Sequence, residues 1–166
     1  MFNYKVPPPK PLVRPYLCLE VSERINKDGE ILVTLNEDDV LAAVRQFKEW
    51  NVKSIAVCLL WSIINPSHEQ RIGEIIKEEW PDIPFSLSSE IQPIIREYHR
   101  MSCVTLNAMT QPTVTEYLQK LQNTLLERGF RGEPLIVISS GGVVPIREVM
   151  KKPVFMLFSG PAMGPV

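Results

Sequence analysis

Four short segments contain small, hydroxyl-bearing or charged residues, which are the residue types that commonly bind substrates. Each segment follows an apolar run of strand length. In open parallel sheets, ligands gather at the carboxyl ends of the strands, so these four positions are the first places to look for chemistry. The segments are Trp61–Glu69, Ser88–Arg96, Ser139–Gly142 and Ser159–Gly164.

The second segment combines two hydroxyls with charged side chains of both signs. Glu90 could accept a proton or a hydrogen bond from a polar substrate, and Arg96 could hold an anion in bidentate fashion. We therefore take Ser88, Glu90 and Arg96 as substrate-side candidates. A helix N-cap followed by a surface ion pair explains the same spacing equally well.

The last two segments are candidates for contact with a nucleotide. At Ser140, Gly141 and Gly142, the missing side chains would let backbone N–H groups approach an anion, but the lysine of a Walker loop is absent and a plain turn is the alternative. Ser159 and Gly160 would open a helix, where a phosphate binds readily. Tight helix packing is the alternative there.

The histidines give no catalytic or metal site. His68 and Glu69 fall in the first turn of an expected helix, which favours a surface or capping role, and His99 lies on a charged helix face that we expect to be solvated. We expect no metal site and no self-contained hydrolase triad, and the catalytic residues remain unknown at this level.

Strands and helices alternate along the chain. Apolar runs predict strands at 55–60, 85–89, 135–140 and 154–158, and a hairpin is indicated by Asn26-Lys27-Asp28-Gly29 between 17–25 and 31–35. Periodic apolar positions predict helices from the Asn36 cap to about 51, from Asn65-Pro66 to 80, and over 97–109, 113–128 and 145–151. This pattern predicts an α/β fold with a mainly parallel sheet and flanking helices, preceded by an antiparallel β-hairpin.

Composition limits the class of protein and its partners. The chain has 166 residues, 45% hydrophobic and 22% charged, with a net charge of −1, which argues against nucleic acid or an anionic membrane as the main partner. No signal peptide or membrane span is visible, so we expect a cytoplasmic protein. We divide it into a proline-rich arm over 1–16, which could serve as a linker or docking arm, and an α/β domain over 17–166.

Taken together in order, these motifs resemble the hydantoinase/oxoprolinase family. The resemblance runs from about residue 10 to the end and also includes Asn107-Ala108. This family contains N-methylhydantoinases and 5-oxoprolinases, which open cyclic amides with ATP, and subunits of acetone and acetophenone carboxylases, which activate ketones. The resemblance implies a partial actin-like ATPase architecture, as in sugar kinases and heat-shock chaperones, and phosphorylation of an amide or enolate oxygen.

The sequence departs from the family pattern at two places. Family members are several times longer and carry two aspartate- and glycine-rich phosphate loops, neither of which occurs here, since serines precede Gly141-Gly142. We therefore expect residues 1–166 to be an internal piece lying between the two loops: an excised piece, a proteolytic fragment or one chain of a split enzyme. ATP and Mg2+ are implied by the resemblance, but we expect this chain alone to bind neither.

Two hypotheses of different class follow. In the first, the chain is part of an ATP-dependent enzyme that acts on a cyclic amide or a ketone and needs a partner segment or subunit with the phosphate loops. In the second, it is a non-catalytic module that completes a larger assembly through its proline-rich arm and an exposed sheet edge.

Overall fold

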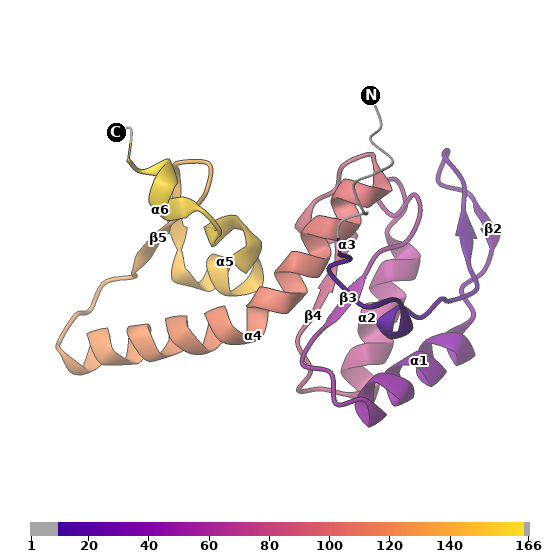
Figure 1. Cartoon of the computed structure of the whole chain (residues 1–166), viewed down its shortest axis with the longest axis horizontal. Coiled ribbons are helices and arrows are strands. Elements are labelled where there is room, and N and C mark those ends of the chain that lie inside the picture. Colours follow the sequence, from indigo (N-terminus) through magenta and orange to yellow (C-terminus); the bar gives the residue numbers. More distant parts are fainter. Residues whose placement is uncertain (1–9, 165–166) are drawn as a thin grey trace.

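Two groups of buried side chains organise the chain. One long helix runs between the two parts of the chain that contain them (Figure 1). A computed structural model describes residues 10–164. Most of the proline-rich arm expected over 1–16 lies outside the described residues, and Pro15–Leu17 form a short 3-10 turn, η1. No helix in the described part is long and apolar enough to span a bilayer.

The elements follow one another in mixed order. The strands are β1 Arg24–Ile25, β2 Ile31–Val33, β3 Ile55–Val57, β4 Phe85–Leu87, β5 Leu135–Val137 and β6 Val143–Pro145. The helices are α1 Glu37–Glu49, α2 Ser67–Glu79, α3 Ser88–Ile91, α4 Glu97–Glu127, α5 Ile146–Lys151 and α6 Ser159–Ala162, with a 3-10 helix η2 at Pro153–Met156.

The strands pair differently from the mainly parallel sheet that the sequence predicted. Within residues 10–164 they form three separate two-stranded sheets, of which β3–β4 is parallel and β1–β2 and β5–β6 are antiparallel. The α/β class is correct and the N-terminal hairpin is confirmed. The error arises at residues 138–142, where a tight turn returns the chain antiparallel to β5 instead of leading into a crossover helix.

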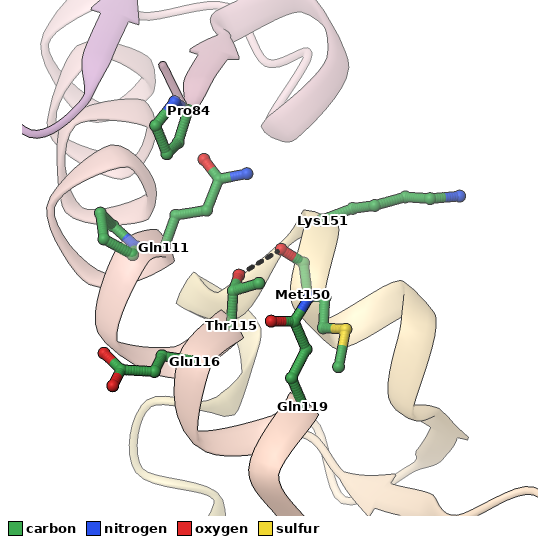
Figure 2. A pocket seen from close by; sticks show the side chains of 8 residues that line it. Pro84, Gln111, Thr115, Glu116, Gln119, Met150 and Lys151 are labelled. Carbon is green, nitrogen blue, oxygen red and sulfur yellow. Dashed lines mark hydrogen bonds between the residues drawn. The ribbon is translucent and has the colours of Figure 1, made fainter. Parts of the chain in front are cut away.

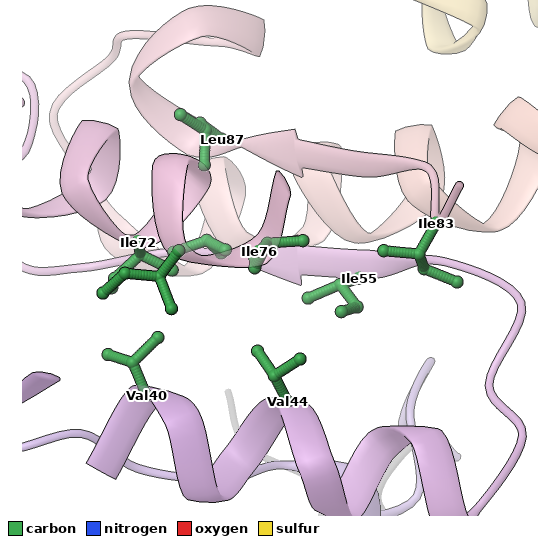
Figure 3. Close-up of a cluster of buried hydrophobic side chains, with 9 residues drawn as sticks. Val40, Val44, Ile55, Ile72, Ile76, Ile83 and Leu87 are labelled. Carbon is green, nitrogen blue, oxygen red and sulfur yellow. The ribbon is translucent and has the colours of Figure 1, made fainter. Parts of the chain in front are cut away.

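The first core lies between α1, α2 and one face of the β3–β4 pair. Val40 and Val44, one turn apart on α1, point toward Ile72 and Ile76 of α2 (Figure 3). Ile55 of β3 lies beside them, and Val57, Phe85 and Leu87 complete this face. Because side chains alternate along a strand, the residues between them must face the other way.

Helix α4 covers that other face of the strand pair. Ser86, the middle residue of β4, donates a hydrogen bond to the Gln111 side chain at 3.2 Å and accepts one from the Asn107 side chain at 2.9 Å. The β3–β4 pair is therefore enclosed between α1 and α2 on one side and α4 on the other.

Helix α4 is continuous where the sequence predicted two helices. Pro112 lies inside it. The helix is visibly bent (Figure 1). A proline in a helix removes one backbone hydrogen bond and clashes with the preceding turn, which usually kinks rather than ends a well-packed helix. Here both halves are held by packing, the first through Val104 and Ala108 and the second through Leu118. The predicted end of the helix is correct, with Gly129 at φ +86°.

The second core lies beyond this kink. Leu118 of α4 packs with Ile146 and Val149 of α5, and Ile136 and Val144 from the β5–β6 hairpin surround them. The strand predicted over 154–158 does not form, and η2 occupies most of this stretch. Pro153 begins that turn. The backbone N–H of Ser139 donates to the Phe155 carbonyl at 2.7 Å, and no strand ladder forms around this contact.

The predicted cap of α1 is confirmed. Asn36 accepts a hydrogen bond from the backbone N–H of Asp38 at 3.1 Å. Asp39, in the first turn of the helix, accepts from the backbone N–H of Ser22 at 2.9 Å. Hydrogen bonding to Ser22 lowers the pKa of Asp39 below its ordinary value, because it stabilises the charged form.

Candidate functional site

The substrate-side candidates lie at the carboxyl end of β4 but do not share one environment. Ser88 is fully buried at the start of α3, whereas Glu90 and Arg96 are exposed on the segment that leads to α4. Of the three, only Glu90 and Arg96 have side chains that reach solvent, and their role toward a substrate stays a prediction.

Glu69 lies beneath this segment, although its position in the sequence predicts a surface or capping role. Its side chain is 0% exposed. One carboxylate oxygen accepts from the Leu59 backbone N–H at 2.9 Å and from the Ser88 hydroxyl at 2.6 Å. The other accepts from the backbone N–H and the hydroxyl of Ser89, at 2.8 and 2.7 Å. Four donors meet a buried carboxylate, which is how buried charge is tolerated.

Arg100 provides the positive charge of the same network and was also missed. It is 1% exposed and donates to the Leu59 carbonyl at 2.6 Å, the Ile94 carbonyl at 3.1 Å and the Ser88 hydroxyl at 3.1 Å. Arginine can only donate, so the Ser88 hydroxyl accepts from Arg100 and donates to Glu69.

A periodic signal in the sequence could have revealed both charges. Glu69 is followed at helical spacing by buried residues at 72 and 76, and Arg100 by buried residues at 104 and 108. A charged residue in register with an apolar stripe lies on the buried face of its helix.

His68 is buried as well, and it fastens the N-terminal hairpin to α2. Its Nδ1 lies 2.8 Å from the Glu23 carboxylate, with both side chains almost fully enclosed. Its Nε2 is buried without a hydrogen-bond partner among the described residues. Since a carboxylate accepts, Nδ1 carries the proton in this contact. His99, by contrast, is exposed, as expected.

Three residues near the candidate segments adopt backbone conformations that favour glycine. They are Trp61 after β3, Arg96 after β4 and Phe158 before α6, with φ of +57°, +84° and +62°. Such strain is held in place by surrounding structure and concentrates at functional sites. Phe158 is also 81% exposed, so its ring is available for contact.

The nucleotide-side candidates form a turn and a very short helix. Ser140, Gly141 and Gly142 make the exposed turn of the β5–β6 hairpin, and the Gly141 N–H donates to the Ile138 carbonyl at 2.9 Å. Gly141 needs its glycine, at φ +83°, for the turn itself. The segment is thus a hairpin turn, and its contact with a nucleotide stays a prediction.

Ser159 and Gly160 open α6, which has four residues. A side chain added at Gly160 would meet open space, so no closed cradle surrounds it. A triphosphate needs several converging donors or cations. Among the described residues, these two segments do not bring several donors or cations together at one point by themselves. In the described part of the chain, no group of three His, Cys, Asp or Glu side chains could hold a metal ion.

The segment with the substrate-side candidates contacts the C-terminal unit, by which we mean the chain from β5 to α6. Lys152, just after α5, donates to the Glu90 carbonyl at 2.7 Å. Asn107, fully buried in α4, donates to the Lys151 carbonyl at 3.3 Å and accepts from the Val154 N–H at 3.1 Å. Both candidate regions are thus attached to one frame.

A groove of about 370 Å3 lies elsewhere, at the kink of α4 (Figure 2). Pro84, Gln111 and Met150 line it, and Thr115 donates across it to the Met150 carbonyl at 3.4 Å. Its mixed lining brings no set of donors or charges to one point. None of the candidate residues contributes to it.

Two family models match the chain in sequence order. Residues 1–80 match the hydantoinase/oxoprolinase N-terminal region, and residues 100–166 match hydantoinase/oxoprolinase. The chain belongs to the hydantoinase/oxoprolinase family. The resemblance inferred from the motifs is therefore confirmed.

Two of the relatives in this family are named as subunits of enzymes. The chain is 33% identical to the caprolactamase alpha subunit of Pseudomonas jessenii, over 99% of this chain and 24% of that protein. It is also 33% identical to the acetophenone carboxylase gamma subunit of Aromatoleum aromaticum, over 95% of this chain and 21% of that protein. This hydantoinase/oxoprolinase chain thus spans about a quarter of the length of these relatives.

A solved structure supports the same assignment. The crystal structure of the ATP-dependent caprolactamase from Pseudomonas jessenii matches with a TM-score of 0.87 and 32% identity, over 98% of this chain and 23% of that one. The described hydantoinase/oxoprolinase fold therefore also occurs inside a much larger enzyme chain.

Proposed function

We propose that this chain forms part of an ATP-dependent enzyme that opens cyclic amides or activates ketones, and that it has no turnover by itself. The observation that carries the proposal is the match of nearly the whole chain to the ATP-dependent caprolactamase at a TM-score of 0.87. The exposed turn at Gly141 and the open space around Gly160 support the second half of the proposal.

In this proposal the roles are divided between this chain and the rest of the enzyme. Ser140–Gly142 and Ser159–Gly160 border the nucleotide, while Glu90 and Arg96 face the organic substrate. ATP and Mg2+ bind between these segments and phosphate loops on the remaining part or on a partner subunit. We place the assembled enzyme in the cytoplasm and assign it a partial actin-like ATPase fold. Within it, residues 1–16 form an arm and residues 17–166 form an internal portion of the nucleotide-binding region.

Mixing the 166-residue chain with a separately purified chain that carries the two phosphate loops tests the proposal. We expect ATP hydrolysis stimulated by a lactam, hydantoin, 5-oxoproline or ketone only in the mixture, with Mg-ATP slowing hydrogen exchange over 139–160. Turnover by the 166-residue chain alone would contradict it.

Gly160→Val is the sharper variant for this test. Because a side chain at Gly160 would enter open space, the fold should tolerate valine, whereas any substitution at Gly141 also strains its turn. We expect Gly160→Val to abolish nucleotide protection in the mixture. Thr113→Val, exposed on α4, is the matched control and should leave protection unchanged.

A non-catalytic role in assembly is the second candidate, and the edge of β2 favours it. Ile31, Leu32 and Val33 are all exposed on a strand that is paired on one side only. Such an edge readily adds another strand. A stable complex in the same mixing experiment, formed without any effect of Mg-ATP or substrate, would favour this candidate.

A further inference from the structure

The two loops at the carboxyl end of the parallel β3–β4 pair are tied to the same buried carboxylate. Glu69 accepts the Leu59 N–H from the loop after β3 and the Ser89 N–H from the segment after β4. Each carboxylate oxygen therefore holds one loop backbone. Since parallel strands end at the same edge, the two loops lie side by side over Glu69.

Arg100 holds the same loops through their carbonyl groups. It donates to the Leu59 carbonyl and to the Ile94 carbonyl, so Leu59 is bound at its N–H by Glu69 and at its C=O by Arg100. The Ser88 hydroxyl lies between the two charges and links them. All donors and acceptors named here are paired, which a buried charge pair requires.

Both loops contain a strained residue next to these anchors. Trp61 lies two positions after Leu59, and Arg96 two positions after Ile94, each at a positive φ. Conformations of this kind persist only where the surroundings hold them. The Glu69–Arg100 network anchors each loop two positions before its strained residue.

We infer that Glu69 and Arg100 are positioning residues, which lock the loops after β3 and β4 into one rigid edge and fix the directions of Glu90 and Arg96. Neither residue touches the substrate, because both are buried. The rigidity of the edge stands on the contacts above. Its use in aligning a substrate rests on the proposed function.

Hydrogen exchange of the 166-residue chain tests the rigidity without any activity. In Glu69→Gln, one oxygen becomes an NH2 group that faces N–H donors, so at least one loop amide loses its acceptor. We expect exchange at the Leu59 or Ser89 amide to rise about tenfold or more, while the amides of 55 and 87 change little. Glu74→Gln, exposed on the same helix, is the control and should change neither.

Two outcomes would overturn the inference. One is a rise at Leu59 and Ser89 in Glu69→Gln no larger than at the core amides or than in Glu74→Gln. The other needs no variant. It is the finding that, in the unaltered chain, the Leu59 and Ser89 amides exchange as fast as the amides of a free peptide. The second measurement keeps the test decisive if Glu69→Gln does not fold, and Ser88→Ala then provides the milder variant.

Kinetics of the assembled enzyme separate this inference from the proposed function. We expect Glu69→Gln to raise KM for the organic substrate or lower kcat, with the KM for ATP unchanged. If the unaltered mixture is inactive, the proposed function fails while the exchange result stands. If the mixture is active and Glu69→Gln matches it, the positioning role fails.

Discussion

Asn107 accepts a hydrogen bond from the backbone N–H of Val154 at 3.1 Å, across 47 positions of the chain. The same side chain donates to Ser86 in β4 and to the Lys151 carbonyl at the end of α5. One buried amide therefore connects the first core to the C-terminal unit.

Removing this amide should weaken the connection. In Asn107→Ala, the Val154 N–H and the Lys151 carbonyl lose their partner, and each unpaired buried group costs about 1–3 kcal/mol. We expect the free energy of unfolding in urea to fall by about 2–4 kcal/mol, with faster exchange at the Val154 amide. Asn123→Ala, exposed on α4, is the control. Unchanged protection of Val154 would contradict the role of Asn107.

Replacing Arg100 by an uncharged residue should lower the free energy of unfolding more than replacing an exposed arginine. Arg100→Met removes the hydrogen bonds to the Leu59 and Ile94 carbonyls and to the Ser88 hydroxyl, and a hydrogen bond to a charged group typically contributes about 1.5–3 kcal/mol. Urea unfolding followed by circular dichroism measures the loss. Arg45→Met on the exposed side of α1 should stay within about 0.5 kcal/mol of the unaltered chain. Equal effects of the two variants would show that the network is not stabilising.

The cap of α1 should respond to the chemistry of residue 36. Asn36→Ala removes the acceptor for the Asp38 N–H, and we expect a loss of about 1 kcal/mol in the free energy of unfolding. Asn36→Asp keeps an acceptor at the same place and should retain that stability. If both variants are equally unstable in urea, the cap contributes nothing.

Asp39 should make stability depend on pH in one direction. Hydrogen bonding to Ser22 lowers its pKa in the folded chain, so its contribution is fully present above the unfolded value of about 3.9 and is lost as pH falls through the folded value. The stability difference between the unaltered chain and Asp39→Asn should therefore be larger at neutral pH than in acid. An NMR titration that places the pKa of Asp39 at or above 3.9 would refute this.

The features predicted correctly from the sequence depend on neighbours along the chain. Asn36 caps a helix by reaching two residues ahead, and the Asp28-Gly29 turn closes a hairpin between adjacent strands. The family was identified because its motifs occur in the same order along the chain. That order does not depend on which residues contact one another in the folded structure.

The features missed depend on distant partners. The burial of Arg100 is set by Leu59, 41 positions earlier, and that of Glu69 by Ser88, 19 positions later. The run at 154–158 has the length and polarity of a strand but no strand beside it, so it forms a 3-10 turn. Pro112 fails to end α4 because packing on both sides holds the helix.

The two cores occupy separate stretches of sequence, the first within 21–87 and the second within 114–156. During synthesis, the first core can therefore emerge and pack before any residue of the second has left the ribosome, and units generally fold in this order. The first half of α4 then emerges onto a finished surface and docks there. Its second half becomes the template on which the remaining chain collapses.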